Sequence, residues 1–406
     1  MRETAALAVG FLLIVIMIIR KVNIGTTMFT ASIVMGFIAG FGFLGIMKVL
    51  FLSITEIATV QLLAVVYVIC ILSYILQKYG ILNKMADSLE ELFNNNWFSL
   101  MFLPLLVGVL SIPGGAVISA PVVDSVGDKM GISNVRKAAI NMVFRHLVFF
   151  LFPFSTTIIL ASQISGVSPY TIIKYNAPIG IVSILAGYII FIRSSVKAAK
   201  GETIRPDKGL IKRIGAVLMY TSPLWVGIVF NLAFGLPFFL ALAPGIAIAY
   251  LLSGKERDGF AKDIVSGINW NMLYGVAGIM CLQGFIKQMP SIAQWINDLL
   301  ESGIDIRILI ILSAAVLGLL TANSTATNGM LLPMFMPLAG SVYSEAYITS
   351  LLFVASFMFY LISPMHLCQI FTSEYFKVNV KELYREYRLF WPILFIAMIV
   401  CYLFVY

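Results

Sequence analysis

The sequence has little charge and almost no catalytic side chains. Charged residues make up 11% of its 406 positions, against about a quarter in ordinary soluble domains. It has 2 histidines, and none of the patterns HExxH, GxSxG and GxxxxGK[ST] occurs. These patterns are typical of zinc proteases, serine hydrolases and ATP-driven machines. We therefore expect neither an enzyme nor an ATPase.

Cysteine is also scarce. The 4 cysteines all lie in apolar stretches, so their spacing predicts neither a disulfide framework nor a structural zinc site. The formal net charge of +8 is not concentrated in a basic run interleaved with aromatic residues, which argues against binding to nucleic acid. No cofactor is expected apart from a bound sodium ion, for which the argument follows below.

Apolar residues dominate what is present. They form 60% of the chain, and the mean hydropathy is +0.98, which predicts a multi-pass protein of the cell (cytoplasmic) membrane, surrounded by lipid. A helix needs about 20 apolar residues to cross the bilayer. This rule finds ten candidate spans, near residues 3–19, 24–44, 58–78, 134–163, 170–193, 211–232, 236–252, 268–287, 345–372 and 388–405.

Two further apolar segments, 98–127 and 306–341, are interrupted by small and polar residues. Each arm is too short to cross the bilayer, so each segment is expected to form a re-entrant hairpin. The expected fold is thus all-α, with about ten transmembrane helices and two hairpins. Amphipathic stretches before the hairpins, 81–96 and 291–302, suit helices lying in the membrane interface.

The basic residues are distributed unevenly over the connecting segments. With ten spans and the amino terminus outside, 21 of the 27 lysines and arginines fall on the inner side, as the positive-inside rule requires. Both termini are expected outside, and the polar linker 194–210 is expected in the cytoplasm.

The chain carries an internal repeat. An offset of 211 residues aligns Cys70 with Cys281 and gives seven identities within 21 positions. The same offset also aligns the interruptions of the two segments 98–127 and 306–341. We therefore expect two repeats, 1–193 and 211–406, of five spans and one hairpin each. Because five is odd, the second repeat should enter the membrane from the opposite side, as in many secondary transporters.

The hairpin tips are rich in small and polar residues. The first tip is 111–115, with Ser111, Gly114 and Gly115, and the second is 323–328, with Asn323, Ser324, Thr325, Thr327 and Asn328. One such cluster alone is also typical of a kink or a helix contact. Two clusters at equivalent repeat positions favour a binding site.

Two long spans contain further breaks. One holds Ser155 and Thr156 after a proline, and the other holds Ser363 and His366 around a proline. Half-helices at such breaks point N–H groups at an anion and C=O groups at a cation, although a simple proline kink is the alternative. Of the few ionisable residues in spans, Asp124 and Arg145 form a candidate charge pair near the inner surface, and His366 is a candidate substrate or proton contact.

These features resemble the ion transporter superfamily, which includes divalent-anion:sodium symporters, gluconate-type permeases, sodium/proton antiporters and arsenite permeases. The run 111–124 together with 323–330 is most similar to the DUF401 family of integral membrane proteins. In dicarboxylate members each tip carries Ser-Asn-Thr; here the second tip has Asn323-Ser324-Thr325, whereas the first departs from that pattern. The resemblance implies a homodimer with a moving transport domain, an arrangement called an elevator.

The sequence therefore predicts a secondary active transporter of a small anionic solute, coupled to sodium. Proton-coupled permeation or cation/proton antiport is the alternative, and an enzyme or a channel fits less well. The candidate sodium ligands are Ser111, Asn323, Ser324 and Ser363. The candidate substrate contacts are Gly114, Gly115, Ser155, Thr156, Thr325, Thr327, Asn328 and His366.

Overall fold

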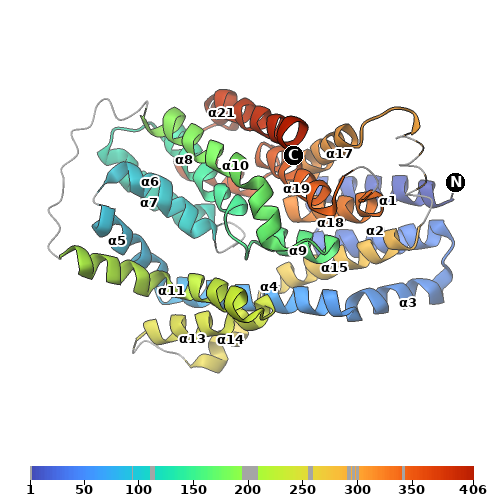
Figure 1. Ribbon diagram of the computed structural model, residues 1–406, viewed down its shortest axis with the longest axis horizontal. Coiled ribbons are helices and arrows are strands. Elements are labelled where there is room, and N and C mark those ends of the chain that lie inside the picture. Colours follow the sequence, from blue (N-terminus) through green and yellow to red (C-terminus); the bar gives the residue numbers. More distant parts are fainter. Residues whose placement is uncertain are drawn as a thin grey trace.

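The computed structural model describes residues 2–93, 95–109, 115–193, 209–254, 259–289, 294, 298, 301–340 and 343–406. Every regular element in these ranges is a helix (Figure 1). The all-α prediction is confirmed.

The first half of the chain, up to the linker, forms helices that are mostly shorter than a bilayer crossing. They are α1 (Arg2–Ile19), α2 (Ile24–Ala39), α3 (Gly42–Thr55), α4 (Ile57–Lys78), α5 (Ile81–Phe93), α6 (Asn96–Gly108), α7 (Ala116–Lys129), α8 (Asn134–Leu147), η1 (Val148–Phe150), α9 (Thr156–Ser165), α10 (Pro169–Gly187) and η2 (Tyr188–Arg193).

The second half shows a similar succession of lengths. Its helices are α11 (Leu210–Phe234), α12 (Phe238–Ala241), α13 (Ala243–Leu252), α14 (Phe260–Ser266), α15 (Trp270–Lys287), α17 (Ile306–Thr321), α18 (Ser324–Phe335), η4 (Met336–Leu338), α19 (Glu345–Leu361), α20 (Leu367–Phe376), α21 (Val380–Val400) and η5 (Cys401–Val405).

The helix boundaries follow the repeat offset. Shifting α9 by 211 residues gives the bounds of α20, and shifting the start of α8 gives the start of α19. Packing partners exchange in the same way: α2 packs on α15 and α13 on α4, while α7 packs on α20 and α18 on α9. This regularity agrees with a duplication. The opposite insertion of the two halves stays a prediction.

Five helices are long and apolar enough to cross a membrane singly: α1, α4, α10 with η2, α11, and α21 with η5. The chain is thus a multi-pass membrane protein. The spans expected at 134–163 and 345–372 are each divided, by the breaks between α8 and α9 and between α19 and α20. Both divisions lie at the prolines that marked them in the sequence.

One helix was not foreseen. The span expected at 24–44 ends earlier, because Gly40 has φ +92° and stops α2 in the left-handed conformation that glycine adopts without strain. The chain then forms α3, which ends at Glu56, where ψ of 132° interrupts the helix before α4. Apolar composition marks both segments as membrane-buried but does not place the break between them.

A buried ion pair fastens α14 to the end of α4. The Asp263 side chain is fully buried, and its carboxylate accepts hydrogen bonds from Lys78 Nζ at 2.7 Å and from the Tyr79 hydroxyl at 2.6 Å. A buried carboxylate is tolerated when it is paired and hydrogen-bonded in this way. Helix α14 meets α15 at a bend of 53°, so the pair also fixes the direction in which α15 begins.

The predicted interfacial helix at 81–96 is α5, whose apolar face, including Ile81, Met85 and Leu89, is buried. Its predicted counterpart at 291–302 lies largely outside the described residues, as does the linker from 194 to 208.

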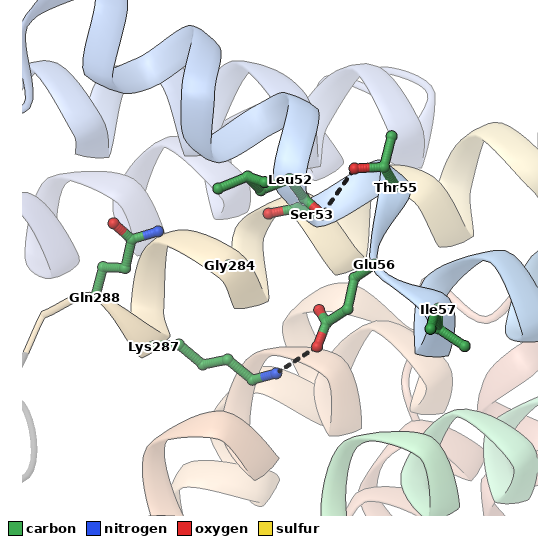
Figure 2. A pocket seen from close by; sticks show the side chains of 8 residues that line it. All are labelled: Leu52, Ser53, Thr55, Glu56, Ile57, Gly284, Lys287 and Gln288. Atoms are coloured by element: carbon green, nitrogen blue, oxygen red, sulfur yellow. Dashed lines mark hydrogen bonds and ion pairs between the residues drawn. The ribbon is translucent and has the colours of Figure 1, made fainter.

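A hollow of about 490 Å³ opens where α3 meets α4, beside the end of α15 (Figure 2). Lys287 and Glu56 face each other across it, with Nζ and Oε1 3.7 Å apart and both side chains half exposed. No predicted site residue lines this hollow. An exposed pair of this kind contributes at most about 1 kcal/mol, so the hollow is a surface feature rather than the site.

Candidate functional site

The turn of the second hairpin is shorter than predicted. Helix α17 ends at Thr321 and α18 begins at Ser324, so only Ala322 and Asn323 lie between them. Ala322 takes the left-handed φ of +49°, and Asn323 Oδ1 accepts a hydrogen bond from the backbone N–H of Ala326 at 2.9 Å. Asparagine is a strong N-cap, so the polar run after it continues as helix rather than as irregular chain.

The polar residues at the start of α18 meet α9 and α19 in a buried set that we call the hydroxyl cluster. Ser324 Oγ lies 3.0 Å from Ser356 Oγ on α19. Asn328 Nδ2 donates to Ser356 Oγ at 2.6 Å. The members of the cluster are Thr157, Thr321, Ser324, Thr325, Thr327, Asn328 and Ser356.

Two more hydrogen bonds complete the hydroxyl cluster. Thr325 Oγ1 lies 2.7 Å from Thr157 Oγ1 on α9, and Thr327 Oγ1 lies 3.0 Å from Thr321 Oγ1 at the end of α17. The structure thus gives four of the predicted site residues of α18 hydrogen-bond partners, in three separate groups that link α18 to α9, to α19 and to the end of α17.

Two oxygens in this region have no hydrogen-bond partner among the described residues. They are Oδ1 of Asn328 and Oγ of Ser155, and both are buried. Ser155 directly precedes α9, whose first residue is the buried Thr156, and α9 packs on α18. Leaving such a group unsatisfied costs about 1–3 kcal/mol, and two oxygens of this kind are suitable ligands for a hard cation.

A second buried set lies where α8 meets the break between α19 and α20. His146, His366 and Cys368 place one potential ligand atom each within 4.8 Å of one another. The two imidazole rings meet edge to face at 4.9 Å, and the ring of Tyr360 lies 4.3 Å from that of His366. We call His146, His366 and Cys368 the imidazole–thiol cluster.

Arg145 adjoins this cluster and reaches the first hairpin. Its side chain is 4% exposed, and a Cβ added at Gly115 would lie 2.4 Å from Nη2 and 2.6 Å from Nη1. The guanidinium also interacts electrostatically with the Cys368 side chain. Only glycine allows this approach, so the prediction that Gly115 contributes to a site acquires a physical reason.

The predicted pairing of Asp124 with Arg145 differs from what the structure shows. Asp124 instead accepts a hydrogen bond from Lys137 Nζ at 2.5 Å, and Asp128 accepts another at 2.7 Å. Lys137 lies about two helical turns before Arg145 on α8, and α7 passes beside α8. The Gly115 end of α7 therefore meets Arg145, while Asp124, further along, meets the lysine. Arg145 lies at the hairpin tip rather than in a peripheral ion pair.

Other predicted residues have structural partners or lie outside the described part. Ser363 Oγ donates to the carbonyl oxygen of Leu319 at 2.6 Å, which ties the α19–α20 break to α17. Asn323 caps α18, as described above. Ser111 and Gly114 lie outside the described residues. Sodium ligation by Ser111, Asn323, Ser324 and Ser363 and substrate contact by Gly114 stay predictions.

Sequence reasoning missed Tyr360, Cys368, His146 and Ser356 as members of the site. A signal was present in the repeat offset, which aligns Arg145 with Ser356, Cys368 with Thr157 and His366 with Ser155. These three positions are polar in both copies of the repeat, whereas His146 aligns with Phe357. Cys368 was passed over because cysteine is common in apolar helices without any ligand.

Comparison with known proteins supports this architecture. No curated protein matches the chain. Among solved structures, the YdaH transporter of Alcanivorax borkumensis, described as having an unusual topology, superposes with a TM-score of 0.60 at 14% identity, covering 89% of this chain and 88% of that one. At this identity the match shows a shared fold. The wider resemblance to the ion transporter superfamily stays a prediction.

The family model described as "Protein of unknown function (DUF401)" matches residues 4–405. The match extends over both halves of the chain and includes both polar clusters. The chain belongs to the DUF401 family.

Proposed function

We propose that this protein is a secondary active transporter of a small anionic solute, coupled to sodium. The observation that carries the proposal is the presence of two polar clusters at helix breaks in the interior of a multi-pass membrane protein. Irregular backbone and polar groups are tolerated inside a membrane protein where they line a site. The transporter that shares this fold, YdaH, supports the same class of function.

The two clusters suit different ligands. The hydroxyl cluster and the neighbouring Ser155 supply only oxygen and amide groups, and Asn328 Oδ1 and Ser155 Oγ have no hydrogen-bond partner among the described residues. Oxygen ligands suit a hard cation such as sodium. Arg145 presents a guanidinium beside Gly115 at the start of α7. A guanidinium next to a helix N-terminus is a favourable place for a carboxylate or another oxyanion.

The proposed movement follows from how the helices are grouped. The two hairpins, α6–α7 and α17–α18, pack on the broken pairs α8–α9 and α19–α20. We propose that these helices move together, as an elevator within a homodimer, against a scaffold formed by α1–α4 and α11–α15. The proposed hairpins are re-entrant, the repeats are inverted, and both termini face outward.

Uptake by the purified, reconstituted protein tests the function. Solutes that shift the thermal unfolding of the detergent-purified chain, screened from small carboxylates and inorganic oxyanions, identify the labelled substrate for this assay, because a ligand at 100 times its dissociation constant stabilises by about 2.7 kcal/mol. We expect saturable accumulation against a gradient in sodium buffer and none in choline buffer. Flux that neither saturates nor runs against a gradient would indicate a channel instead.

The second candidate is proton coupling, which the adjoining imidazoles of His146 and His366 favour. The variant His366→Gln separates the two readings. Under sodium coupling it leaves the sodium dependence of uptake intact. Transport that is equal in sodium and choline, but stops when the pH gradient is collapsed, supports proton coupling and overturns the sodium assignment.

Topology is tested with single cysteines in a cysteine-free background. A cysteine in the linker 194–210 should resist an impermeant maleimide in intact cells, whereas one near either terminus should react. Labelling of the linker from outside contradicts the proposed orientation.

A further inference from the structure

The imidazole–thiol cluster has a composition that sodium coupling does not use. Its three side chains offer two ring nitrogens and one sulfur within 4.8 Å of one another. Around a metal bound at about 2.0–2.3 Å, such ligand atoms lie about 3.3–3.8 Å apart. The cluster is therefore within roughly 1 Å of a coordination geometry, a distance that small side-chain rotations can close.

The hydrogen bonding of the two histidines leaves nitrogens available. His146 Nδ1 lies 2.6 Å from the carbonyl oxygen of Met142. A carbonyl only accepts, so Nδ1 carries the proton and Nε2 keeps its lone pair. This is the support that metal-bound histidines usually have. His366 is 3% exposed, and its Nδ1 has no hydrogen-bond partner among the described residues. Each ring thus has a nitrogen with no protein partner assigned to it.

The third ligand provides a route of entry. Cys368 is the one cluster member that is not fully buried, and Leu367 beside it is 56% exposed. Binding breaks the S–H bond of Cys368, releases the proton to solvent and forms a metal–sulfur bond. No electron is transferred in this step.

The charge of Arg145 selects between metals. Nitrogen and sulfur ligands suit soft or borderline cations such as Cu(I) and zinc. The guanidinium of Arg145, which interacts electrostatically with the Cys368 side chain, repels a divalent ion twice as strongly as a monovalent ion at the same distance. One thiolate balances a monovalent cation but not a divalent one. We propose that His146, His366 and Cys368 form a binding site for a soft monovalent cation of the Cu(I) type.

Silver binding tests the site, because Ag(I) has the same charge and ligand preference and is not oxidised in air. Calorimetry uses the full chain in chloride-free detergent buffer, with Cys70, Cys281 and Cys401 replaced by alanine. We expect one Ag(I) per chain, an affinity about 100-fold lower in Cys368→Ser, and an affinity about tenfold lower in His146→Gln and in His366→Gln. As a matched control, restoring the buried Cys281 should leave the stoichiometry at one.

Thermal unfolding shows whether a variant has lost the metal site or has failed to fold. One equivalent of Ag(I) should raise the midpoint of thermal unfolding of the protein that retains Cys368, but not that of Cys368→Ser. Without metal, the midpoints of these two proteins should lie within a few degrees of each other. Zinc should bind more weakly than silver, and Arg145→Met should reduce the ratio between the silver and zinc affinities. Unchanged silver affinity in Cys368→Ser overturns the site, and zinc binding tighter than silver overturns the assignment to a monovalent ion. Neither result depends on uptake, so the proposed transport function is judged separately.

Discussion

The hydroxyl cluster and the imidazole–thiol cluster each join residues from both halves of the chain, yet their chemistry differs. Ser155, Thr157 and Ser356, which lie in or beside the hydroxyl cluster, align at the 211-residue offset with His366, Cys368 and Arg145, which lie in or beside the imidazole–thiol cluster. One region offers oxygen atoms alone, whereas the other offers nitrogen, sulfur and a fixed positive charge. The same arrangement of broken helices therefore supports two kinds of recognition.

Side-chain volume changes together with chemistry in the two clusters. The long Arg145 faces Gly115, which has no side chain. At the offset positions lie Ser356 and Ala326, and both are fully buried. A large side chain thus faces a glycine in one case, whereas both residues at the corresponding positions are small. The comparison can be tested by altering one cluster at a time.

The largest loss of uptake is expected from Gly115→Ala. The added Cβ would lie 2.4 Å from Arg145 Nη2, so the guanidinium must move, and a displacement of about 1 Å at a binding site can reduce turnover about 100-fold. Uptake by proteoliposomes measures the loss. Gly215→Ala in α11 is the matched control, since nothing lies within 4 Å of its Cβ, and it should retain full uptake. Full uptake in Gly115→Ala would remove Arg145 from the site.

A smaller effect, confined to sodium, is expected from Asn328→Ala. The change removes the buried Oδ1 and the amide that donates to Ser356 Oγ at 2.6 Å. Loss of one oxygen ligand and one hydrogen bond should raise the half-saturating sodium concentration about tenfold, corresponding to about 1.4 kcal/mol. Uptake against sodium concentration measures this at saturating substrate. An unchanged sodium curve with a raised substrate KM would instead place the substrate in the hydroxyl cluster.

The Thr157–Thr325 hydrogen bond allows a double-mutant cycle. Thr157→Val and Thr325→Val each remove one hydroxyl of the pair that lies 2.7 Å apart while nearly conserving volume. Each should raise the half-saturating sodium concentration about fivefold, and the double variant should be little worse, since the coupling is about 1 kcal/mol. Strictly additive losses would show that the two hydroxyls act independently.

The smallest effect, on thermal stability, is expected at the start of α17, which is the first arm of the second hairpin. Hydrogen bonds from Arg307 hold the pKa of Asp305 below its usual value of 3.8. The ionised form is therefore favoured by folding, and its contribution is present above about pH 3.8 and lost as the pH falls through the lower folded value. Asp305→Asn keeps a capping oxygen and should cost about 0.5 kcal/mol or less at pH 7.

Thermal midpoints measured from pH 7 down to pH 2.5 check this sign. The difference between Asp305→Asn and the parent protein should shrink toward zero at the acidic end. A difference that grows as the pH falls would contradict the assigned pairing.

The sequence predicted the fold well in the segments that contain a proline, a polar hairpin tip or a repeated pattern. Breaks were expected at 153–157 and 363–366 and an interfacial helix at 81–96, and the structure has breaks before α9 and before α20 and the helix α5. The break between α2 and α3 was missed, because apolar residues on both sides of Gly40 give the same membrane signal as one continuous span. Membrane insertion depends on composition, whereas the end of a helix depends on a single backbone conformation.

The candidate site was predicted less completely, for a physical reason. Clusters of oxygens near helix ends are visible as polar runs, so Ser324, Thr325 and Asn328 were found. Arg145 was expected to pair with Asp124 and Cys368 was not expected in the site, because their contact arises only when α8 meets the start of α20. The partner of Asp124 depended on which residues of α7 and α8 lie at the same level, which spacing along one chain does not determine.

The early end of α2 at Gly40 has a consequence for the surrounding lipid. A helix of 16 residues is about 24 Å long, shorter than the roughly 30 Å of a typical hydrocarbon core, whereas α11, with 25 residues, exceeds that thickness. A bilayer that meets both helices must thin at one place and accommodate a tilted helix at another, at a fraction of a kcal/mol per Å. We therefore expect the stability of the folded protein to depend on the acyl-chain length of the surrounding lipid.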